Sequence, residues 1–334
     1  MAAHAGVSQT SVSRAFQEHS PLAEKTRNKV LASARILGYR PNAVARSLIT
    51  KRSGLAAILL TEATQRDAPD VLFFISQALI QNGFQPLLFP TALEQDGAEA
   101  LAQAMAFGVD GIVSCVGLSA QDLAQARLRQ RPLVLFNRQG ADADTSVIAC
   151  DHAGASSLLA SRLYAAGHRR FAVVNGPRDA PVSVLRVEGF LSRLAELGVT
   201  AVRQVAGDYH YESGHAAAMA LFAGSGPADA ATRPEVVFCA NDAMALGMLD
   251  AVRFSLMLQV PRDVSVVGFD DVPTGRRPAY LLTTVRQPFE EMAQLAAQTL
   301  RAEVDNPDTP PQHALLRGDL IERGSAILLP HHTG

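Results

Sequence analysis

The chain has 334 residues, more than one typical domain contains, so at least two compact units are expected. Apolar residues make up 48% and charged residues 19%, which is typical of a soluble globular protein. The sequence has no run of eighteen apolar residues and no export signal at its start, so we expect no membrane association and a cytoplasmic location.

The net charge of −2 conceals a strong asymmetry along the chain. Residues 1–53 contain nine Lys or Arg and two Glu, a net charge of +7, which leaves −9 for the rest. A small basic segment on a larger acidic body is typical of a part that docks on nucleic-acid phosphates. A solvated basic face without a partner is the alternative.

The first segment with a clear pattern is "GVSQTSVSRAF", residues 6–16. Ser8 can cap a helix from Gln9 to about Gln17, and Val12 and Phe16, four residues apart, would face inward. The outward positions hold short polar side chains of the kind that read base edges, namely Gln9, Thr10, Ser13 and Arg14.

A further helix is expected over 24–37 and ends at Gly38, with an apolar stripe made of Val30, Leu31, Ala34 and Leu37. Three short helices around one small core, with polar residues on the second, fit a helix-turn-helix. A generic helical hairpin fits the composition equally well.

The segment "AGVSQTSVSRAF…EKTRNKVLASARILGYRPNAVARSL" resembles the DNA-binding head and hinge of the lactose-repressor (LacI/GalR) family, because its motifs occur in the family's order and spacing. The resemblance implies a helix-turn-helix head over 1–40 and a hinge over 41–53 that becomes helical on operator DNA. It implies DNA contacts by Ser8, Gln9, Thr10, Ser13, Arg14, Asn42, Ala45, Arg46 and Leu48, the last as a wedge in the minor groove.

The resemblance has one departure, at the start of the head. The family's head begins several residues earlier, and Met1 stands where a valine is usual, which leaves only "MAAHA" of the first helix. A helix of three or four residues is marginal on its own. We therefore expect a truncated first helix, an incomplete head core and a longer native N-terminus.

From residue 54 onward, short apolar runs alternate with helix-like stretches. Strands are expected at 55–60, 86–89, 111–116, 132–136, 146–150, 171–175, 235–240, 264–269 and 282–287. Helices are expected at 70–83, 153–168, 184–198 and 242–254. This alternation predicts an α/β body whose parallel sheets are covered by helices on both faces, in a doubly wound arrangement.

The three cysteines of the body are far apart, and each lies inside or beside a strand-like run: Cys115, Cys150 and Cys239. This spacing predicts buried thiols in a reducing compartment and neither a disulfide framework nor a metal site.

Polar side chains follow the ends of five predicted strands: Thr61 and Glu62, Asn137 and Arg138, Asn175, Asn241 and Asp242, and Asp270 and Asp271. Open parallel sheets bind ligands at the carboxyl ends of their strands, and amides and carboxylates suit a polyhydroxylated ligand. Because polar residues also begin such loops as helix caps, capping is the alternative at each position.

The body resembles the effector domain of the same family, which is itself similar to periplasmic sugar-binding proteins, up to about residue 330. The resemblance rests on "GHRRFAVVNGP", "RVEGF", "FCANDAMALGMLDA", "VPRDVSVVGFDD" and "LTTVRQP". It implies two subdomains joined by three crossovers within 54–330. The N subdomain is expected at 54–150 and 286–312, the C subdomain at 151–285 and 313–330, and a tail at 331–334.

The resemblance also implies the effector contacts. It aligns Arg186, Asn241 and Asp270 with the family's common contacts and Tyr209 with its stacking aromatic, while Asn137 stands where sugar-responsive members often carry Asp. A salt-bridged Arg186 and a core Tyr209 are the alternatives. The full candidate effector site is Thr61, Glu62, Asn137, Arg186, Tyr209, Asn241 and Asp270.

The sequence therefore predicts a homodimeric transcription repressor that binds operator DNA and a small sugar or polyol effector. The alternative is a sugar-binding receptor without DNA-binding activity. The sequence lacks a GxSxG, HExxH or Walker A motif and a GxGxxG after a strand, so we expect neither enzymatic activity nor a cofactor or metal.

Overall fold

The computed structural model describes residues 1–16, 21–39, 52–92, 96–138, 143–178, 180–223 and 233–328. The chain forms two compact units, the head Met1–Gly54 and the body Leu55–Gly334. Within the described residues no helix has both the length and the apolar character that crossing a membrane requires.

The head contains three helices, α1 (Ala2–Ala5), α2 (Gln9–Ala15) and α3 (Glu24–Ile36), around a core of Ala5, Val12, Ala15 and Val30. Ser8 caps α2 as predicted, since its Oγ accepts a hydrogen bond of 3.1 Å from the Ser11 amide. The short α1 is a single turn that ends at Gly6, whose φ of 57° is the left-handed conformation that glycine adopts readily. Ala5, the last residue of α1, is completely buried in the head core.

The predicted apolar stripe of α3 is wrong at one position. Leu37 is 47% exposed within the described residues, whereas Val30 and Ala34 are buried and Leu31 is half-buried. The helix ends at Ile36, so Leu37 is its C-cap and does not extend the inward face.

The body contains two parallel sheets, as the sequence predicts. The first has the order β11-β5-β4-β3-β1-β2, with strands β1 (Leu55–Thr61), β2 (Gln85–Thr91), β3 (Gly111–Ser114), β4 (Leu133–Phe136), β5 (Ser146–Cys150) and β11 (His313–Leu316). The second has the order β7-β6-β8-β9, with strands β6 (Phe171–Asn175), β7 (Arg203–Ala206), β8 (Val236–Cys239) and β9 (Ser265–Val267). We call these parts the N lobe and the C lobe.

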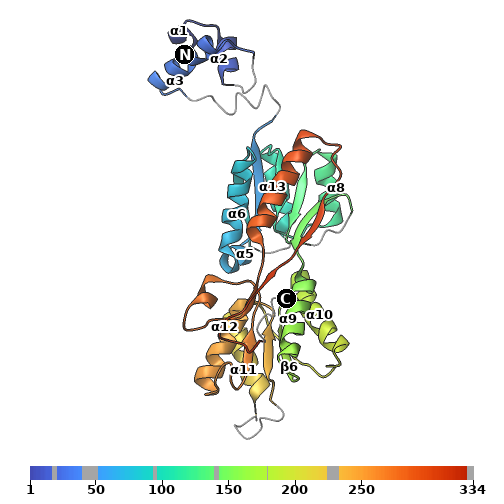
Figure 1. Ribbon diagram of the computed structural model, residues 1–334. Helices are drawn as coiled ribbons and strands as arrows, with labels where there is room; N and C mark the ends of the chain where they lie inside the picture. Colours follow the sequence, from blue (N-terminus) through green and yellow to red (C-terminus); the bar gives the residue numbers. More distant parts are fainter. Residues whose placement is uncertain are drawn as a thin grey trace. The chain divides into compact units, whose positions relative to one another are not determined.

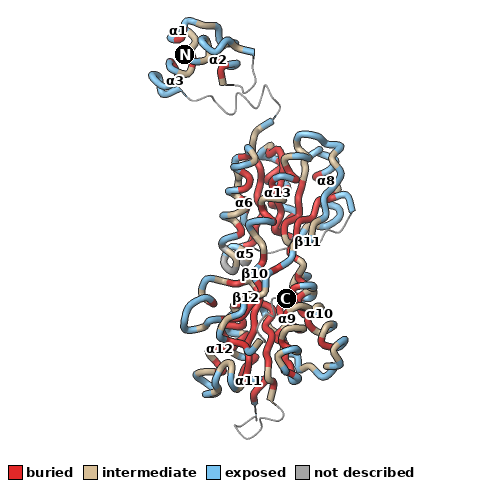
Figure 2. The backbone as a smooth tube through the Cα atoms, in the orientation of Figure 1, coloured by how far each residue is buried: buried red, intermediate tan, exposed pale blue. Residues whose placement is uncertain are grey.

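Both faces of the N-lobe sheet are buried under helices. Along β4, Val134 and Phe136 pack with α6 (Pro69–Gln81) and α13 (Phe289–Asp305), while Leu133 and Leu135 pack with α7 (Gly97–Ala106) and α8 (Ala120–Leu128). Alternate side chains of a strand point to opposite faces, so an unbroken apolar run is the expected pattern for such a strand. Figure 2 shows the resulting concentration of buried residues in the strands of the body.

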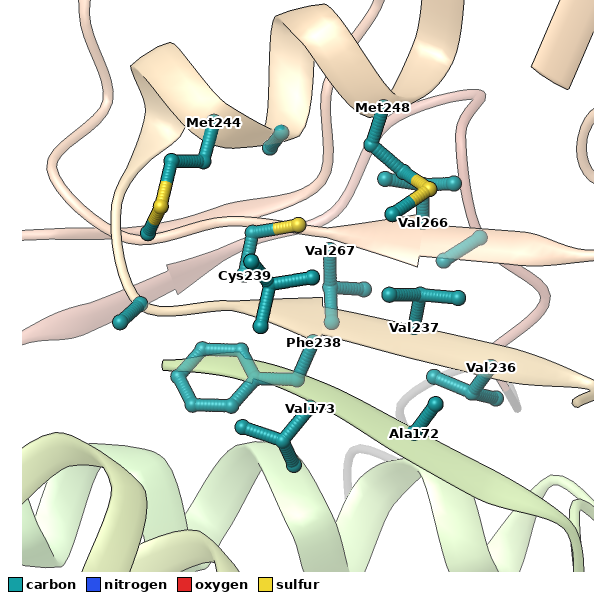
Figure 3. Packing of buried hydrophobic residues seen from close by; sticks show 14 of the residues in the cluster. Ala172, Val173, Val236, Val237, Phe238, Cys239, Met244, Met248, Val266 and Val267 are labelled. Atoms are coloured by element: carbon teal, nitrogen blue, oxygen red, sulfur yellow. The ribbon is translucent and has the colours of Figure 1, made fainter. Parts of the chain in front are cut away.

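The C-lobe sheet is covered in the same way. Helices α9 (His152–Ala165) and α10 (Pro181–Glu196) pack together, as do α11 (Tyr211–Phe222) and α12 (Asp242–Asp250), and Figure 1 shows the two pairs on opposite sides of the sheet. In Figure 3, Met244 and Met248 extend from α12 toward the face of the sheet that carries Cys239, whereas Phe238 points to the other face. There its ring stacks on Phe190 of α10, with 4.6 Å between ring centroids.

Three crossovers connect the lobes. The first lies between Cys150, the end of β5, and His152, the start of α9. The second follows β10 (Thr284–Arg286), and the third lies between β11 and β12 (Asp319–Ile321), which pairs antiparallel with β10. Because β11 pairs with β5 in the N-lobe sheet, the third crossover lies after Leu316, and the expected assignment of residues 313–316 to the C subdomain is wrong.

The three cysteines are buried, as predicted, and none of them forms a disulfide. Burial raises the pKa of the Cys150 thiol to about 12 and raises that of Cys239 further. Both are therefore protonated thiols with little nucleophilic character at neutral pH.

Candidate functional site

Five polar side chains form a closed ring of hydrogen bonds between the lobes, and we call this set the polar ring. Its members come from five different elements: the end of β4, the start of α9, α10, the end of β9 and the segment after β10. They are Asn137, His152, Arg186, Asp270 and Gln287. Both lobes and two of the three crossovers therefore meet at one point.

Arg186 is the cationic member of the ring, and its side chain is only 5% exposed. Its Nε donates to His152 Nδ1 at 3.3 Å, and its Nη2 donates to Asp270 Oδ1 at 2.8 Å. Its Nη1 donates to the Ala240 carbonyl at 2.7 Å, and the guanidinium lies 4.0 Å from the centre of the Phe269 ring. The salt bridge and the cation–π contact compensate the buried charge.

The other side of the ring runs through two amides. His152 Nε2 lies 3.0 Å from Asn137 Oδ1, which also accepts a hydrogen bond of 3.2 Å from the Cys150 amide. Asn137 Nδ2 donates to Gln287 Oε1 at 2.8 Å. Gln287 Nε2 then donates to Asp270 Oδ1 at 2.7 Å, which closes the ring.

The donor and the acceptor of every hydrogen bond in the polar ring can be assigned, because some of its groups can only donate and others can only accept. An arginine Nε can only donate, so His152 Nδ1 must accept and the proton of the neutral imidazole is on Nε2. Burial and the positive charges of Arg186 and Arg138 lower the pKa of His152 well below its ordinary value, which keeps the imidazole neutral. The Cys150 amide and the Asp270 carboxylate fix the two amide orientations in the same way.

The backbone around the site adopts positive φ at several residues that are not glycine. The values are 55° for Asn137, 71° for Tyr209, 125° for Asp270 and 58° for Asp271. Such conformations cost energy in an ordinary side chain and tend to gather at functional sites, where the surrounding structure holds them.

Tyr209 and Asn241 form a second pair beside the ring in the C lobe. Asn241 caps α12 through Oδ1, which accepts from the Met244 amide at 3.0 Å, while its Nδ2 donates to the Tyr209 carbonyl at 3.0 Å. The Tyr209 ring lies so close to Gly176 that a Cβ there would stand 2.4 Å from Cε1. The Tyr209 hydroxyl is buried without a hydrogen-bond partner among the described residues, and burial raises its pKa. Asn241 thus positions the loop that carries the tyrosine.

Thr61 and Glu62 are not joined to the polar ring by any described contact. Thr61 is buried and caps α5 (Glu62–Asp67), since its Oγ1 accepts from the Thr64 amide at 3.0 Å. Glu62 is exposed in the first turn of that helix. The capping alternative therefore accounts for the Thr61 side chain.

His152 and Gln287 are ring members that the sequence analysis did not select. Both lie close behind a strand, as Asn137 and Asp270 do: His152 is two residues after β5, and Gln287 is next to β10. The same rule of polar residues at strand ends, applied to these two strands, is the signal that finds them.

The two other aspartates of the strand ends lie in different surroundings. The Asp271 side chain is fully buried and binds three arginines, at 3.2 Å from Arg276, 2.7 Å from Arg286 and 2.5 Å from Arg323. We call this group the arginine clamp. It joins β10 and the segment after β12 to the end of β9.

Asp242 is fully buried and makes no salt bridge with the described residues. Its Oδ1 accepts from the Thr284 hydroxyl at 2.6 Å and its Oδ2 from the Val272 amide at 2.9 Å. Burial, with the nearby charge of Asp270, raises the pKa of Asp242 to about 7.

In the head, the predicted DNA contacts on α2 and at its cap are all exposed: Ser8, Gln9, Thr10, Ser13 and Arg14. The hinge residues Asn42, Ala45, Arg46 and Leu48, like the tail 331–334, lie outside the described residues. Among the described residues no group of three or more His, Cys, Asp or Glu side chains is placed to hold a metal ion.

Comparisons with known proteins agree with this two-part architecture. A family model of bacterial regulatory proteins of the lacI family matches residues 1–42, and a model of a periplasmic binding protein-like domain matches residues 160–326. The HTH-type transcriptional regulator reg1 of Streptomyces lividans is 33% identical, over 100% of this chain and 97% of the relative. The chain belongs to the LacI family.

Further relatives of this LacI-family regulator show the same full-length similarity. The ribose operon repressor of Escherichia coli K12 is 30% identical over 96% of this chain and 97% of the relative. A crystal structure of the lac repressor dimer bound to operator and the anti-inducer ONPF is 26% identical, with a TM-score of 0.83 over 97% of each chain. The chain is thus a DNA-binding transcriptional regulator with a helix-turn-helix domain and a ligand-binding domain.

Proposed function

We propose that this LacI-family regulator is a cytoplasmic homodimeric repressor whose operator affinity is changed by a small hydroxylated effector bound at the polar ring. The observation that carries the proposal is the ring itself, in which side chains from both lobes and two crossovers meet. A ligand that bonds to these groups favours one arrangement of the lobes over another, and such a preference is all that allosteric control requires. The lac repressor, whose dimer was solved with operator and anti-inducer, is a precedent for the assembly.

The proposed effector contacts are Asn137, Arg186 and Asp270 in the ring, with Tyr209 as a platform for a ring-shaped ligand and Asn241 beside it. Thr61 and Glu62 complete the proposed site from the N lobe. The Tyr209 hydroxyl supports its role, because a buried hydroxyl without a partner is satisfied once a ligand oxygen binds it. A sugar fits this combination of aromatic face and polar groups.

The proposed DNA contacts are the exposed polar residues of α2 together with the hinge. Gln9, Thr10, Ser13 and Arg14 would read base edges in the major groove, and Ser8 would orient the helix start. Asn42, Ala45, Arg46 and Leu48 would act in the minor groove. Two heads of a homodimer would then read a pseudo-palindromic operator.

A binding assay on labelled genomic fragments tests the proposal. We expect nanomolar affinity for one fragment, a steep loss of affinity with increasing salt, and a stoichiometry of two chains per site. Arg14→Ala should abolish the preference for that fragment, while the matched control Arg35→Ala, an exposed arginine on α3, should weaken binding to all fragments only slightly. A protein that is monomeric and binds no DNA would be a receptor instead.

A further inference from the structure

The polar ring determines which kind of hydrogen bond Asn137 can offer to a ligand. Its Oδ1 already accepts from two donors, the Cys150 amide and His152 Nε2. Its Nδ2 gives one hydrogen to Gln287, and the second N–H has no acceptor among the described residues. Asn137 can therefore offer a ligand only a hydrogen-bond donor, the second N–H of its Nδ2.

Arg186 has the same one-sided capacity. A guanidinium has five N–H groups and no acceptor. Three of these groups donate to His152, Ala240 and Asp270, which leaves two that no described residue accepts. The charge of Arg138 also reaches the site: after burial and Arg186 it contributes to the lowered pKa of His152, and it slightly opposes the rise in the pKa of Tyr209 that burial causes. This side of the site offers donors and positive potential.

His152 is responsible for this polarity at Asn137. Both of its ring nitrogens are engaged, one as acceptor for Arg186 and one as donor to Asn137, and it is 2% exposed. It therefore has no capacity left for a ligand and acts through its neighbour. An aspartate at position 137 would present acceptors in place of the amide N–H.

We propose that the effector carries a carboxylate or phosphate group that accepts hydrogen bonds from Asn137 and Arg186, in addition to hydroxyl groups. The effector class is therefore a sugar acid or sugar phosphate, with a hydroxyl directed to Asp270. His152 is a positioning residue that sets this preference, because it saturates the Asn137 oxygen. A ligand without an acceptor at this point leaves N–H groups of the buried Arg186 and the half-buried Asn137 unpaired and is rejected. This inference rests on the proposed effector site.

Matched pairs of ligands test the effector class. The purified full chain is melted with 10 mM gluconate, glucuronate, galacturonate, ribose 5-phosphate or glucose 6-phosphate, and with the parent sugars glucose, galactose and ribose. We expect at least one acid to raise the melting temperature by several degrees while its parent sugar does not, since binding stabilises the folded state. The carboxylates and phosphates distinguish the two anionic groups. A parent sugar that matches its acid, or no shift with any acid, overturns the inference.

Variants of the ring test the role of His152 with the acid that binds. His152→Gln keeps a donor that can reach Asn137, so we expect its Kd within about threefold of wild type. His152→Leu removes the donor, and we expect at least tenfold weaker binding of the acid. Asn137→Asp replaces the donor with an anionic acceptor, and we expect at least a hundredfold loss for the acid and a gain for the parent sugar. Equal losses for acid and parent sugar in these variants would show a merely structural role and overturn the assignment.

The DNA-binding assay separates this inference from the proposed function. A chain that binds an operator and responds to a neutral sugar keeps the function and overturns the anionic effector. A chain that binds a sugar acid but no DNA keeps the effector class and contradicts the repressor.

Discussion

The polar ring and the arginine clamp each pair an aspartate with arginine, yet they differ in the hydrogen-bonding groups that they leave available. Their carboxylates, Asp270 and Asp271, are adjacent in the chain. Within the polar ring, Asp270 accepts hydrogen bonds from one arginine and one side-chain amide, and its side chain is 14% exposed. Asp271 is fully buried and takes three arginines.

The difference distinguishes the proposed binding site from a structural cluster. Arg186 and Asn137 in the ring keep N–H groups that no described residue accepts, so a ligand can still bond to them. In the clamp, both Asp271 oxygens are engaged by arginines that hold β10 and the segment after β12 to the C lobe. Unused donors, and not the number of charges, are what distinguish the proposed effector site from the clamp.

The largest expected effect is that of Asp271→Asn. Removing one partner of a buried ion group costs about 3–5 kcal/mol, and we expect the lower end, because Arg276 and Arg286 are each 47% exposed and water can solvate them. The matched change Asp270→Asn should cost clearly less stability and weaken effector binding instead. Urea unfolding measures both variants. Equal stability losses would contradict the distinction between ring and clamp.

Among the arginines of the clamp, we expect the more buried side chain to contribute more to the free energy of unfolding. Arg323 is 14% exposed and also donates to the Leu282 carbonyl, so we expect Arg323→Ala to cost about 2 kcal/mol. Arg286 is 47% exposed, so water screens its contact with the buried Asp271, and Arg286→Ala should cost less than about 1 kcal/mol. Urea midpoints of the two variants give the comparison, and a reversed order would show that the clamp is held mainly from the β10 side.

Asp242 extends the comparison to a buried carboxyl group that makes no salt bridge with the described residues. Its contribution to the stability of the folded protein depends on pH. Its pKa is 3.8 in the unfolded chain and about 7 in the folded protein, so the native state retains a proton between these values. The tighter binding of this proton stabilises the folded state. The stabilisation is complete below pH 4 and is lost as pH rises through 7, by up to about 1.4 kcal/mol per pH unit.

The test is Asp242→Asn, which has no proton to lose. Its amide can donate to the Thr284 hydroxyl and its oxygen can accept from the Val272 amide, so the local bonds persist. We expect the free energy of unfolding of wild type to fall relative to the variant from pH 4 to 7. Parallel curves would show that Asp242 is charged in the folded state.

Much of the fold could be predicted from the sequence because its strands are buried on both faces. All nine expected strands are present, and most of them contain an unbroken apolar run, although β10 reads Thr-Val-Arg and β2 is only partly buried. The three missed strands, β7, β11 and β12, are half-exposed, and β7 and β11 lie at sheet edges. An edge strand is specified by the partner it pairs with, so composition alone gives little signal for it.

The candidate site was only partly predictable for a related reason. Strand ends located Asn137, Arg186 was assigned by resemblance, and both lie in the ring. Whether a polar residue binds a ligand, caps a helix or anchors an arginine depends on neighbours distant in the chain. Thr61 caps α5, and Asp271 lies in the clamp, although each follows a strand as Asp270 does.

We propose, above all, that effector binding at the polar ring controls the affinity of the DNA-binding heads for the operator. The most direct test is operator affinity with and without effector, in wild type, in Arg186→Leu and in Arg193→Ala, a surface arginine of the same helix that pairs with Glu196. We predict that effector changes the affinity of wild type and Arg193→Ala at least fivefold and leaves Arg186→Leu unchanged. An equal response in all three proteins would contradict the account.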